Sequence, residues 1–378
     1  MITFLSIFIF SLFLFLSERK YSLLGVLLLI QLVVFVLFLV EYSYGSLDYL
    51  ISDGKRYFDE AENYVLDSER KAWGLLNYFV KKYDYLPRIF IKFMNIPILF
   101  IFILYLQKTF SLIHFKLLFA FPYLFCLSMS NLRDILIWLS ALMIIRFFYL
   151  KKSPGFFLVF LTLLIFLRPM MMLPIGVFIV VFFLYKNILT RKSKIRKSTI
   201  LNGLAVFILL VGSLFFFRND IQANYNSTVY NLSYLYLNNL DSRLEARAQG
   251  TIQTNNLGKA LLLGAVRYVA APIPSSKIAN LLSDNPEVKY GYFSEYLRLI
   301  GQISYYFMLI YVTLNYKKSI LVLKEFNVTQ KAYLFWLFSF FPIYGFYHFG
   351  AGHQRLKLPF QIFIFIIFIY LYHRKRKQ

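Results

Sequence analysis

Long apolar segments separated by short polar gaps run through almost the whole chain. Each segment approaches the length of about 20 residues that a helix needs to cross the hydrocarbon core of a bilayer, although the first and sixth are short. The pattern therefore predicts an all-α, polytopic bundle of transmembrane helices. The eleven predicted spans are residues 2–16, 22–40, 89–105, 112–128, 132–149, 155–168, 169–185, 200–217, 299–315, 332–347 and 358–372.

Basic residues fill alternate gaps between these segments. Together with the adjoining ends of the segments, those gaps hold 21 Lys and Arg residues against two acidic residues, Glu18 and Glu325. Counted in the same way, the remaining gaps hold 20 basic and 16 acidic residues and include both long loops, 41–88 and 218–298. Because basic loops stay on the cytoplasmic side of a membrane, we predict an external N-terminus, a cytoplasmic C-terminus and two long external loops.

The composition agrees with a membrane protein, since 59% of the residues are hydrophobic and 44 are Phe. The net charge of +23 lies mostly in the predicted cytoplasmic loops, where it faces anionic lipid headgroups, so we expect no nucleic-acid partner. The single cysteine, Cys126, excludes a disulfide framework and a cysteine metal site. We expect no cleavable signal peptide, no internal repeat and a single membrane domain over residues 1–378.

The first external loop contains apolar residues at roughly helical spacing between residues 58 and 82. This spacing predicts two amphipathic helices that cap the bundle. Alternatively, the turn at Asp53-Gly54 aims a carboxylate at a lipid headgroup, and Asp53, Asp59 and Glu60 are the candidates.

Two short external turns carry arginines. In the turn 128–134, Asn131 can cap the following helix and Asp134 suits the helix dipole, but Arg133 is unfavourable at a helix N-terminus unless it faces an anion. Arg168 precedes Pro169 between two spans with almost no loop. An arginine this deep is costly unless it reaches the interface or binds a ligand.

The second external loop contains Arg243 and Arg247, which share one face if this segment is helical. Like charges at that spacing repel, and a bound anion would relieve the repulsion. Glu245 points elsewhere, so a simple ion pair does not account for both arginines, although a solvated charged helix does. Further along, Arg267 lies in an apolar, helix-like run over 261–271 that ends at a Pro-x-Pro break, and there it needs a partner.

The last external turn, 348–359, is rich in small residues and ends in Arg355 and Lys357 at the start of the final span. Both side chains can simply extend to the interface. His348 and His353 are five residues apart, which is a poor spacing for a shared metal site on a helix. We therefore expect no metal and no other cofactor.

These external arginines point to one ligand class. Guanidinium groups bind phosphate oxygens in bidentate fashion and stay charged at any working pH, so a lipid-linked diphosphate would satisfy several of them at once. We predict that they converge on one outer cavity open to lipid. The predicted diphosphate-binding residues are Arg133, Arg168, Arg243, Arg247, Arg267 and Arg355.

The chain resembles the Wzy-type oligosaccharide repeat-unit polymerases of bacterial surface-polysaccharide pathways. It shares their ten to twelve spans, their large external loop in the second half and their external arginines. The locally similar segments are 131–134, 167–169, 267–274 and 353–359. The resemblance also implies a glycosyltransferase C-like architecture, but this chain lacks a clear Asp-Asp or Glu-x-Asp metal motif in its first external loop.

The resemblance implies an enzyme of the bacterial cytoplasmic membrane that acts on polyprenyl diphosphate-linked oligosaccharide, with a chain-length regulator as a further candidate partner. It would transfer a glycan from one polyprenyl diphosphate to the sugar end of another lipid-linked repeat unit. Glu245, Asp53, Asp134 and His353 qualify as the general base by their predicted side of the membrane. The alternatives are an O-antigen ligase, a polyprenyl-phosphate-sugar transferase and a lipid-linked oligosaccharide transporter.

Overall fold

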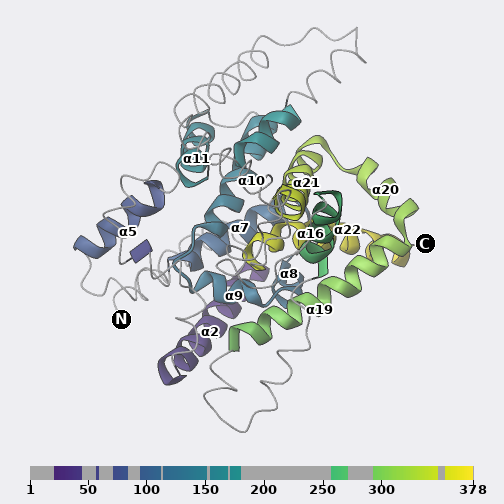
Figure 1. Cartoon of the computed structure of the whole chain (residues 1–378). Coiled ribbons are helices and arrows are strands. Elements are labelled where there is room, and N and C mark those ends of the chain that lie inside the picture. The colour runs from purple at the N-terminus through teal and green to yellow at the C-terminus, as the bar shows by residue number, and fades with distance from the viewer. Residues whose placement is uncertain are drawn as a thin grey trace. The chain divides into compact units, whose positions relative to one another are not determined.

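The described part of the chain is all helical. In the computed structural model, these residues form helices and no strand (Figure 1), as the apolar pattern predicted. The structure describes residues 21–44, 57–58, 71–83, 94–111, 114–150, 154–168, 171–179, 257–270, 293–347 and 354–377.

The chain forms two compact units. Unit 1 comprises residues 1–168, 273–331 and 364–378, and unit 2 comprises residues 169–272 and 332–363. Two helices, α21 (Val328–Phe341) and α22 (Gln354–Lys377), contribute residues to both units. The remaining helices of unit 1 are α2 (Tyr21–Tyr44), α5 (Lys71–Tyr83), α7 (Asn95–Thr109), α8 (His114–Ala120), α9 (Tyr123–Ser128), α10 (Asp134–Leu150), α11 (Pro154–Leu167), α19 (Phe293–Leu314) and α20 (Tyr316–Glu325).

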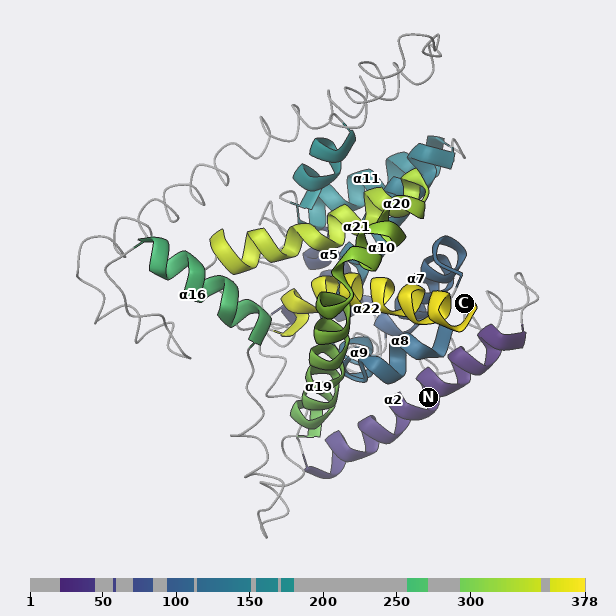
Figure 2. The same ribbon diagram turned by 90° about the vertical axis from the view of Figure 1, so that its right-hand side faces the viewer.

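The core of unit 1 is built around α7 and α10. The middle of each helix is apolar and buried, and Phe102 packs against Trp138 with ring centroids 6.1 Å apart. Helix α10 also packs against α11, and α2 runs alongside α7, α8 and α9 (Figure 2). Apart from Ser140, which bonds to the Leu136 carbonyl of its own helix, the polar side chains of α7 and α10 lie toward the helix ends and define two separate polar regions.

The predicted span 112–128 is a broken helix. Helix α8 ends at Ala120, and α9 begins at Tyr123 after Phe121 and Pro122. Proline has no N–H to continue the hydrogen-bond ladder and its ring clashes with the preceding turn. Opposite the break, α19 carries Gly301, where a Cβ atom would lie 3.7 Å from the Ala120 carbonyl oxygen. A Cβ atom there would make ordinary van der Waals contact, so α19 packs directly against the interrupted backbone.

Two helices contain a window long and apolar enough to cross a membrane, namely Tyr296–Leu314 in α19 and Arg355–Arg374 in α22. Four described helices contain shorter apolar stretches. These are Gly25–Val40, Asn95–Thr109, Pro154–Leu167 and Leu261–Ala270. The expected spans 2–16 and 200–217 lie outside the described residues.

Unit 2 combines α16 (Leu257–Ala270) with the π-helix η3 (Pro342–Tyr347) and parts of α21 and α22. Helix α16 occupies the apolar run that the sequence predicted to be helical. It packs on η3, where a Cβ atom on Gly345 would lie 3.5 Å from the Ala265 Cα. Tyr268 of α16 is buried against Phe341 and Phe360, with ring centroids 5.9 Å and 6.0 Å away.

Candidate functional site

A buried polar cluster lies where α5, α7, α9 and α10 meet in unit 1. We call it the Asn131 cluster, made of Trp73, Asn77, Asn95, Asn131 and the backbone of the turn 128–133. Trp73 Nε1 donates to Asn131 Oδ1 at 3.0 Å, and Asn131 Nδ2 donates to Asn77 Oδ1 at 2.5 Å. Asn77 Nδ2 in turn donates to the Trp73 carbonyl at 2.8 Å. The amide of Asn131, expected to cap α10, therefore also ties α5 to this turn.

Asn95 fixes the same turn from the start of α7. Its Nδ2 donates to the carbonyl oxygens of Ser130 and Leu132, each at 2.6 Å. The residue is fully buried, and its Oδ1 receives no hydrogen bond from the part of the chain that the structure describes. Leaving a buried acceptor unsatisfied costs about 1–3 kcal/mol.

Arg133 has a structural partner that the sequence did not reveal. Its side chain is only 7% exposed, its Nη1 donates to the Leu167 carbonyl, and its guanidinium lies 5.9 Å from the centre of the Tyr57 ring. Leu167 is the last residue of α11, where the helix dipole favours a positive charge. The positive charge of Arg133 is unfavourable at the start of α10 but favourable at the carbonyl end of α11. The second contact offsets the first, so no bound anion is required.

Asp134 and Arg168 border this region. Asp134 is buried in the first turn of α10, as its type and position predicted. Arg168 is half-buried directly after α11, and its backbone N–H donates to the Leu164 carbonyl at 2.8 Å. The contact between Arg133 and the end of α11 therefore brings three of the predicted site residues to neighbouring positions.

The segment 41–88, predicted to be the first external loop, contributes one helix to this cluster. Helix α5 buries Trp73 and Asn77, and its Val80 packs in a small cluster with Phe58, whereas Phe79 is exposed. One of the two predicted amphipathic helices is therefore present, over residues 71–83, and the segment 59–70 lies outside the described residues. Trp73 and Phe79 are both aromatic, but only Trp73 lies on the buried face of this helix. The buried face follows the spacing of residues 73, 77 and 80 because Trp73 has a hydrogen-bond partner in Asn131.

A second cluster, the Lys357 cluster, lies in unit 2 and consists of Arg267, Tyr268, Leu356 and Lys357. Lys357 Nζ donates to the Arg267 carbonyl at 3.2 Å and lies 5.7 Å from the centre of the Tyr268 ring. Tyr268 Oη donates to the Leu356 carbonyl at 2.9 Å. The Arg267 carbonyl belongs to the last turn of α16, which has no helical partner for its carbonyl groups. The lysine and the end of α16 therefore stabilise each other.

The structure corrects the role that the sequence suggested for Lys357. The interpretation that it extends to the interface is wrong, because it is 1% exposed. Its neighbour Arg355 is half-buried. The two side chains are two positions apart and therefore leave a helix in different directions, which was a signal that one of them points inward.

The predicted site residue Arg267 is half-buried on α16. Burial lowers the pKa of its guanidinium from the ordinary value, because desolvation disfavours the charged form. Its carbonyl oxygen, not its guanidinium, accepts the hydrogen bond from Lys357. The Lys357 cluster thus brings a buried ammonium close to two half-buried guanidinium-bearing residues, Arg267 and Arg355.

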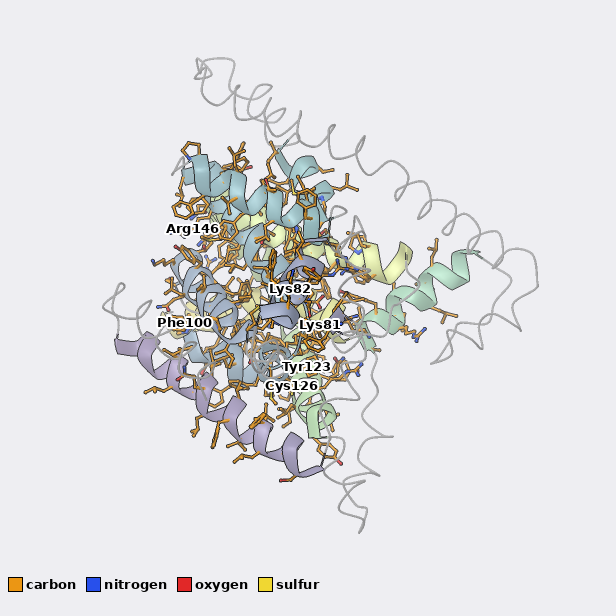
Figure 3. All side chains as sticks on the ribbon, turned by 90° about the vertical axis from the view of Figure 1, so that its left-hand side faces the viewer. Lys81, Lys82, Phe100, Tyr123, Cys126 and Arg146 are labelled. Carbon is orange, nitrogen blue, oxygen red and sulfur yellow. The ribbon has the colours of Figure 1, made fainter. Side chains whose placement is uncertain are left out.

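The opposite ends of α7 and α10 meet in a third group, which we call the Thr109 cluster. Gln330 Nε2 donates to the Thr109 carbonyl at 2.7 Å, and Arg146 Nη1 donates to Thr109 Oγ1 at 3.2 Å. Lys108 and Arg146 lie 5.1 Å and 5.6 Å from the centre of the Tyr105 ring. Arg146 lies well away from Tyr123 and Cys126 of α9 (Figure 3). Because a helix rises about 1.5 Å per residue, about 20 Å separates the two ends of α7.

Five predicted site residues lie outside the described residues, so their place relative to these clusters stays a prediction. The same holds for the acidic alternatives Asp59 and Glu60. The five are Asp53, Arg243, Glu245, Arg247 and His353.

Searches of protein-family models, of curated proteins and of solved structures find no match to this chain. Its function therefore has to be inferred from its own residues and their arrangement.

Proposed function

We propose that this chain is an eleven-span protein of the bacterial cytoplasmic membrane, with its N-terminus outside and its C-terminus in the cytoplasm. One support is the separation of polar side chains between the ends of α7 and α10. The Thr109 cluster contains Lys108 and Arg146, from gaps that the sequence assigns to the cytoplasm. The Asn131 cluster contains residues that the sequence assigns to the external side.

A second support is the apolar surface of α19. Ile300, Ile303, Phe307, Ile310 and Leu314 are all exposed, and Phe307 and Leu314 reach 78%. Their spacing of three and four residues forms one stripe along the helix. A stripe of this length favours contact with lipid rather than with water.

We further propose that the protein is a polysaccharide polymerase that uses polyprenyl diphosphate-linked glycans. The observation that carries this proposal is the placement of basic side chains in buried or half-buried positions in turns and near helix ends that the sequence assigns to the external side. Arg168, Arg267 and Arg355 are the half-buried members, and each presents a guanidinium suited to phosphate oxygens.

In the proposed reaction, a hydroxyl of the acceptor sugar attacks the anomeric carbon of the donor glycan. The bond from that carbon to the diphosphate oxygen breaks, the diphosphate leaves with the electron pair, and a general base takes the hydroxyl proton. Fixed guanidinium groups stabilise the charge that develops on the leaving diphosphate. Among the described residues, Asp134 is a candidate base.

The test has a genetic and a site-directed part. Deleting the gene should leave glycans of a single repeat unit on a gel, whereas a ligase would leave long chains that are not transferred, and that outcome would refute the polymerase proposal. Arg267→Ala should shorten the glycans strongly, because losing one electrostatic donor typically lowers the rate by on the order of 100-fold. This substitution keeps the carbonyl that Lys357 uses, so the helix end stays satisfied.

The control is Arg146→Gln, which removes a half-buried arginine from the Thr109 cluster. The sequence assigns this cluster to the cytoplasmic side, away from the proposed site. At equal protein levels it should give glycans of normal length. Normal length in Arg267→Ala, or equal shortening in both variants, would remove the assigned role of Arg267.

A further inference from the structure

The hairpin between α19 and α21 presents a mixed apolar and basic surface. Helix α20 buries Ser319 and Val322, whereas Tyr316, Ile320 and Leu321 are exposed. Lys317, Lys318 and Lys324 are exposed on the same short helix, and Glu325 at its end pairs with Arg374 at 2.8 Å. Exposed apolar side chains interleaved with lysines are typical of a helix that lies in the headgroup plane of a membrane.

Helix α20 is held in a defined position at its first end. Ser319 Oγ lies 3.1 Å from the carbonyl oxygens of both Val312 and Asn315, so it bonds across the turn from α19. Asn315 Nδ2 donates to the Tyr311 carbonyl at 2.9 Å. The direction in which α20 leaves α19 is therefore set by side-chain hydrogen bonds.

The second end of α20 is fixed more strongly. Phe326 is buried between Tyr370 and Phe110, with ring centroids 4.7 Å and 5.9 Å away. Asn327 and Gln330 exchange hydrogen bonds of 2.9 Å with each other's backbone N–H groups, which forms a capping box for α21. The exposed face of α20 is thus the outward side of a rigid hairpin.

The charge of this region is strongly positive. Between residues 316 and 331 there are four lysines and one acidic residue. Within unit 1, Lys108 and Arg146 approach the same hairpin through Thr109, whose carbonyl binds Gln330. An anionic surface complements this charge, and each basic residue close to such a surface contributes about 1 kcal/mol, or roughly fivefold in binding.

We propose that α20 is an interfacial helix that binds anionic phospholipid headgroups. Ile320 and Leu321 enter the headgroup–acyl boundary, while the stems of Lys317 and Lys324 lie along it and their ammonium groups bind lipid phosphates. The proposal rests on the membrane placement in the proposed function and not on catalysis. It assigns a lipid preference to one element of the protein.

The experiment uses tryptophan as a local reporter. The native Trp73, Trp138 and Trp336 are fully buried, so a new tryptophan at an exposed position reports its own surroundings. Leu321→Trp places it on α20, and Ile303→Trp places it on the α19 stripe at a matched exposure of 50% against 48% for Leu321. The full-length variants are reconstituted in vesicles of brominated phosphatidylglycerol mixed with phosphatidylcholine, or of brominated phosphatidylcholine mixed with phosphatidylglycerol.

We expect Leu321→Trp to be quenched several-fold more by the brominated anionic lipid. That preference should disappear when Lys317, Lys318 and Lys324 are changed together to Gln, and it should weaken in high salt. Ile303→Trp should be quenched equally by both lipids. Equal quenching of Leu321→Trp by both lipids would overturn the anionic preference alone.

Two other outcomes are also decisive. If Ile303→Trp is quenched but Leu321→Trp is not, the interfacial placement of α20 is wrong. Its exposed face would then contact water or protein, for example a second copy of the chain. If neither tryptophan is quenched, the membrane placement in the proposed function fails as well.

Discussion

Two cations in this protein are buried in the same way. Arg133 donates to the last carbonyl of α11, and Lys357 donates to a carbonyl in the last turn of α16. Each also lies near the face of a tyrosine ring, Tyr57 or Tyr268. The carbonyl end of a helix carries a partial negative charge, and an aromatic face attracts cations. These residues therefore hold helix ends in place before any ligand is considered.

Replacing Lys357 with Met should destabilise the protein by about 1–3 kcal/mol, because it leaves the Arg267 carbonyl without this donor while keeping most of the side-chain volume. Arg355→Met, at the half-buried neighbour, should have a smaller effect. Denaturant titration in detergent micelles measures both variants. A Lys357→Met protein as stable as the wild type would mean that the cost of burying the ammonium cancels its contacts.

At the scale of elements, helix α5 is attached to the rest of unit 1 through specific side chains. Trp73 and Asn77 are fully buried, and both bond to Asn131 in the turn before α10. An amphipathic helix on a membrane surface would need no such partners. Their presence indicates that α5 packs against protein on this face.

A double-mutant cycle tests that attachment. Trp73→Phe keeps an aromatic ring but removes the N–H that Asn131 accepts, and Asn131→Ala removes the acceptor. We expect a coupling energy of about 0.5–1.5 kcal/mol between the two changes, the usual net value of a hydrogen bond. Unfolding of both single variants and the double variant would be compared in the same detergent. Additive effects would mean that the bond contributes nothing to stability.

The elements with local signals could be predicted from the sequence. Helix α16 follows from an apolar run that ends before Pro272, and α11 ends where Pro169 forbids further helix. The break between α8 and α9 also had a local cause in Pro122, but the apolar composition around it suggested one continuous span. The ends of a helix were therefore predictable wherever the apolar pattern and a proline indicated the same boundary.

The candidate site was less predictable because its contacts join distant parts of the chain. Lys357 bonds to Arg267 across 90 positions, and Trp73 bonds to Asn131 across 58. Local patterns selected Arg133 correctly as an unusual residue, but not its partner at Leu167. Asn95 carried no signal at all, since a single Asn at the start of an apolar helix is ordinary.

At the scale of the whole molecule, the proposed topology has one direct test. Ser275→Cys lies in the loop 218–298, which is predicted to be external, and Ser193→Cys lies in a basic gap predicted to be cytoplasmic. A thiol reagent that does not cross membranes should label the first in intact cells and the second only after permeabilisation. The native Cys126 is buried and should stay unlabelled in both. The reverse labelling pattern would exclude every external site assignment.

The polar clusters at the two ends of α7 also differ in when all of their hydrogen-bond partners have been synthesised. All partners in the Asn131 cluster, together with Arg133 and the Leu167 carbonyl, have left the ribosome once residue 167 has emerged. The hydrogen bond to the Thr109 carbonyl can form only after Gln330 has been synthesised, and the contact of Lys116 with His373 only after His373 has been synthesised. At about 5–20 residues per second, roughly ten to thirty seconds of synthesis separate position 167 from position 330. In the proposed membrane topology, the contacts at the Asn131 end of the first half would therefore form during synthesis, while the contacts at its basic end would form only after the last helices are made.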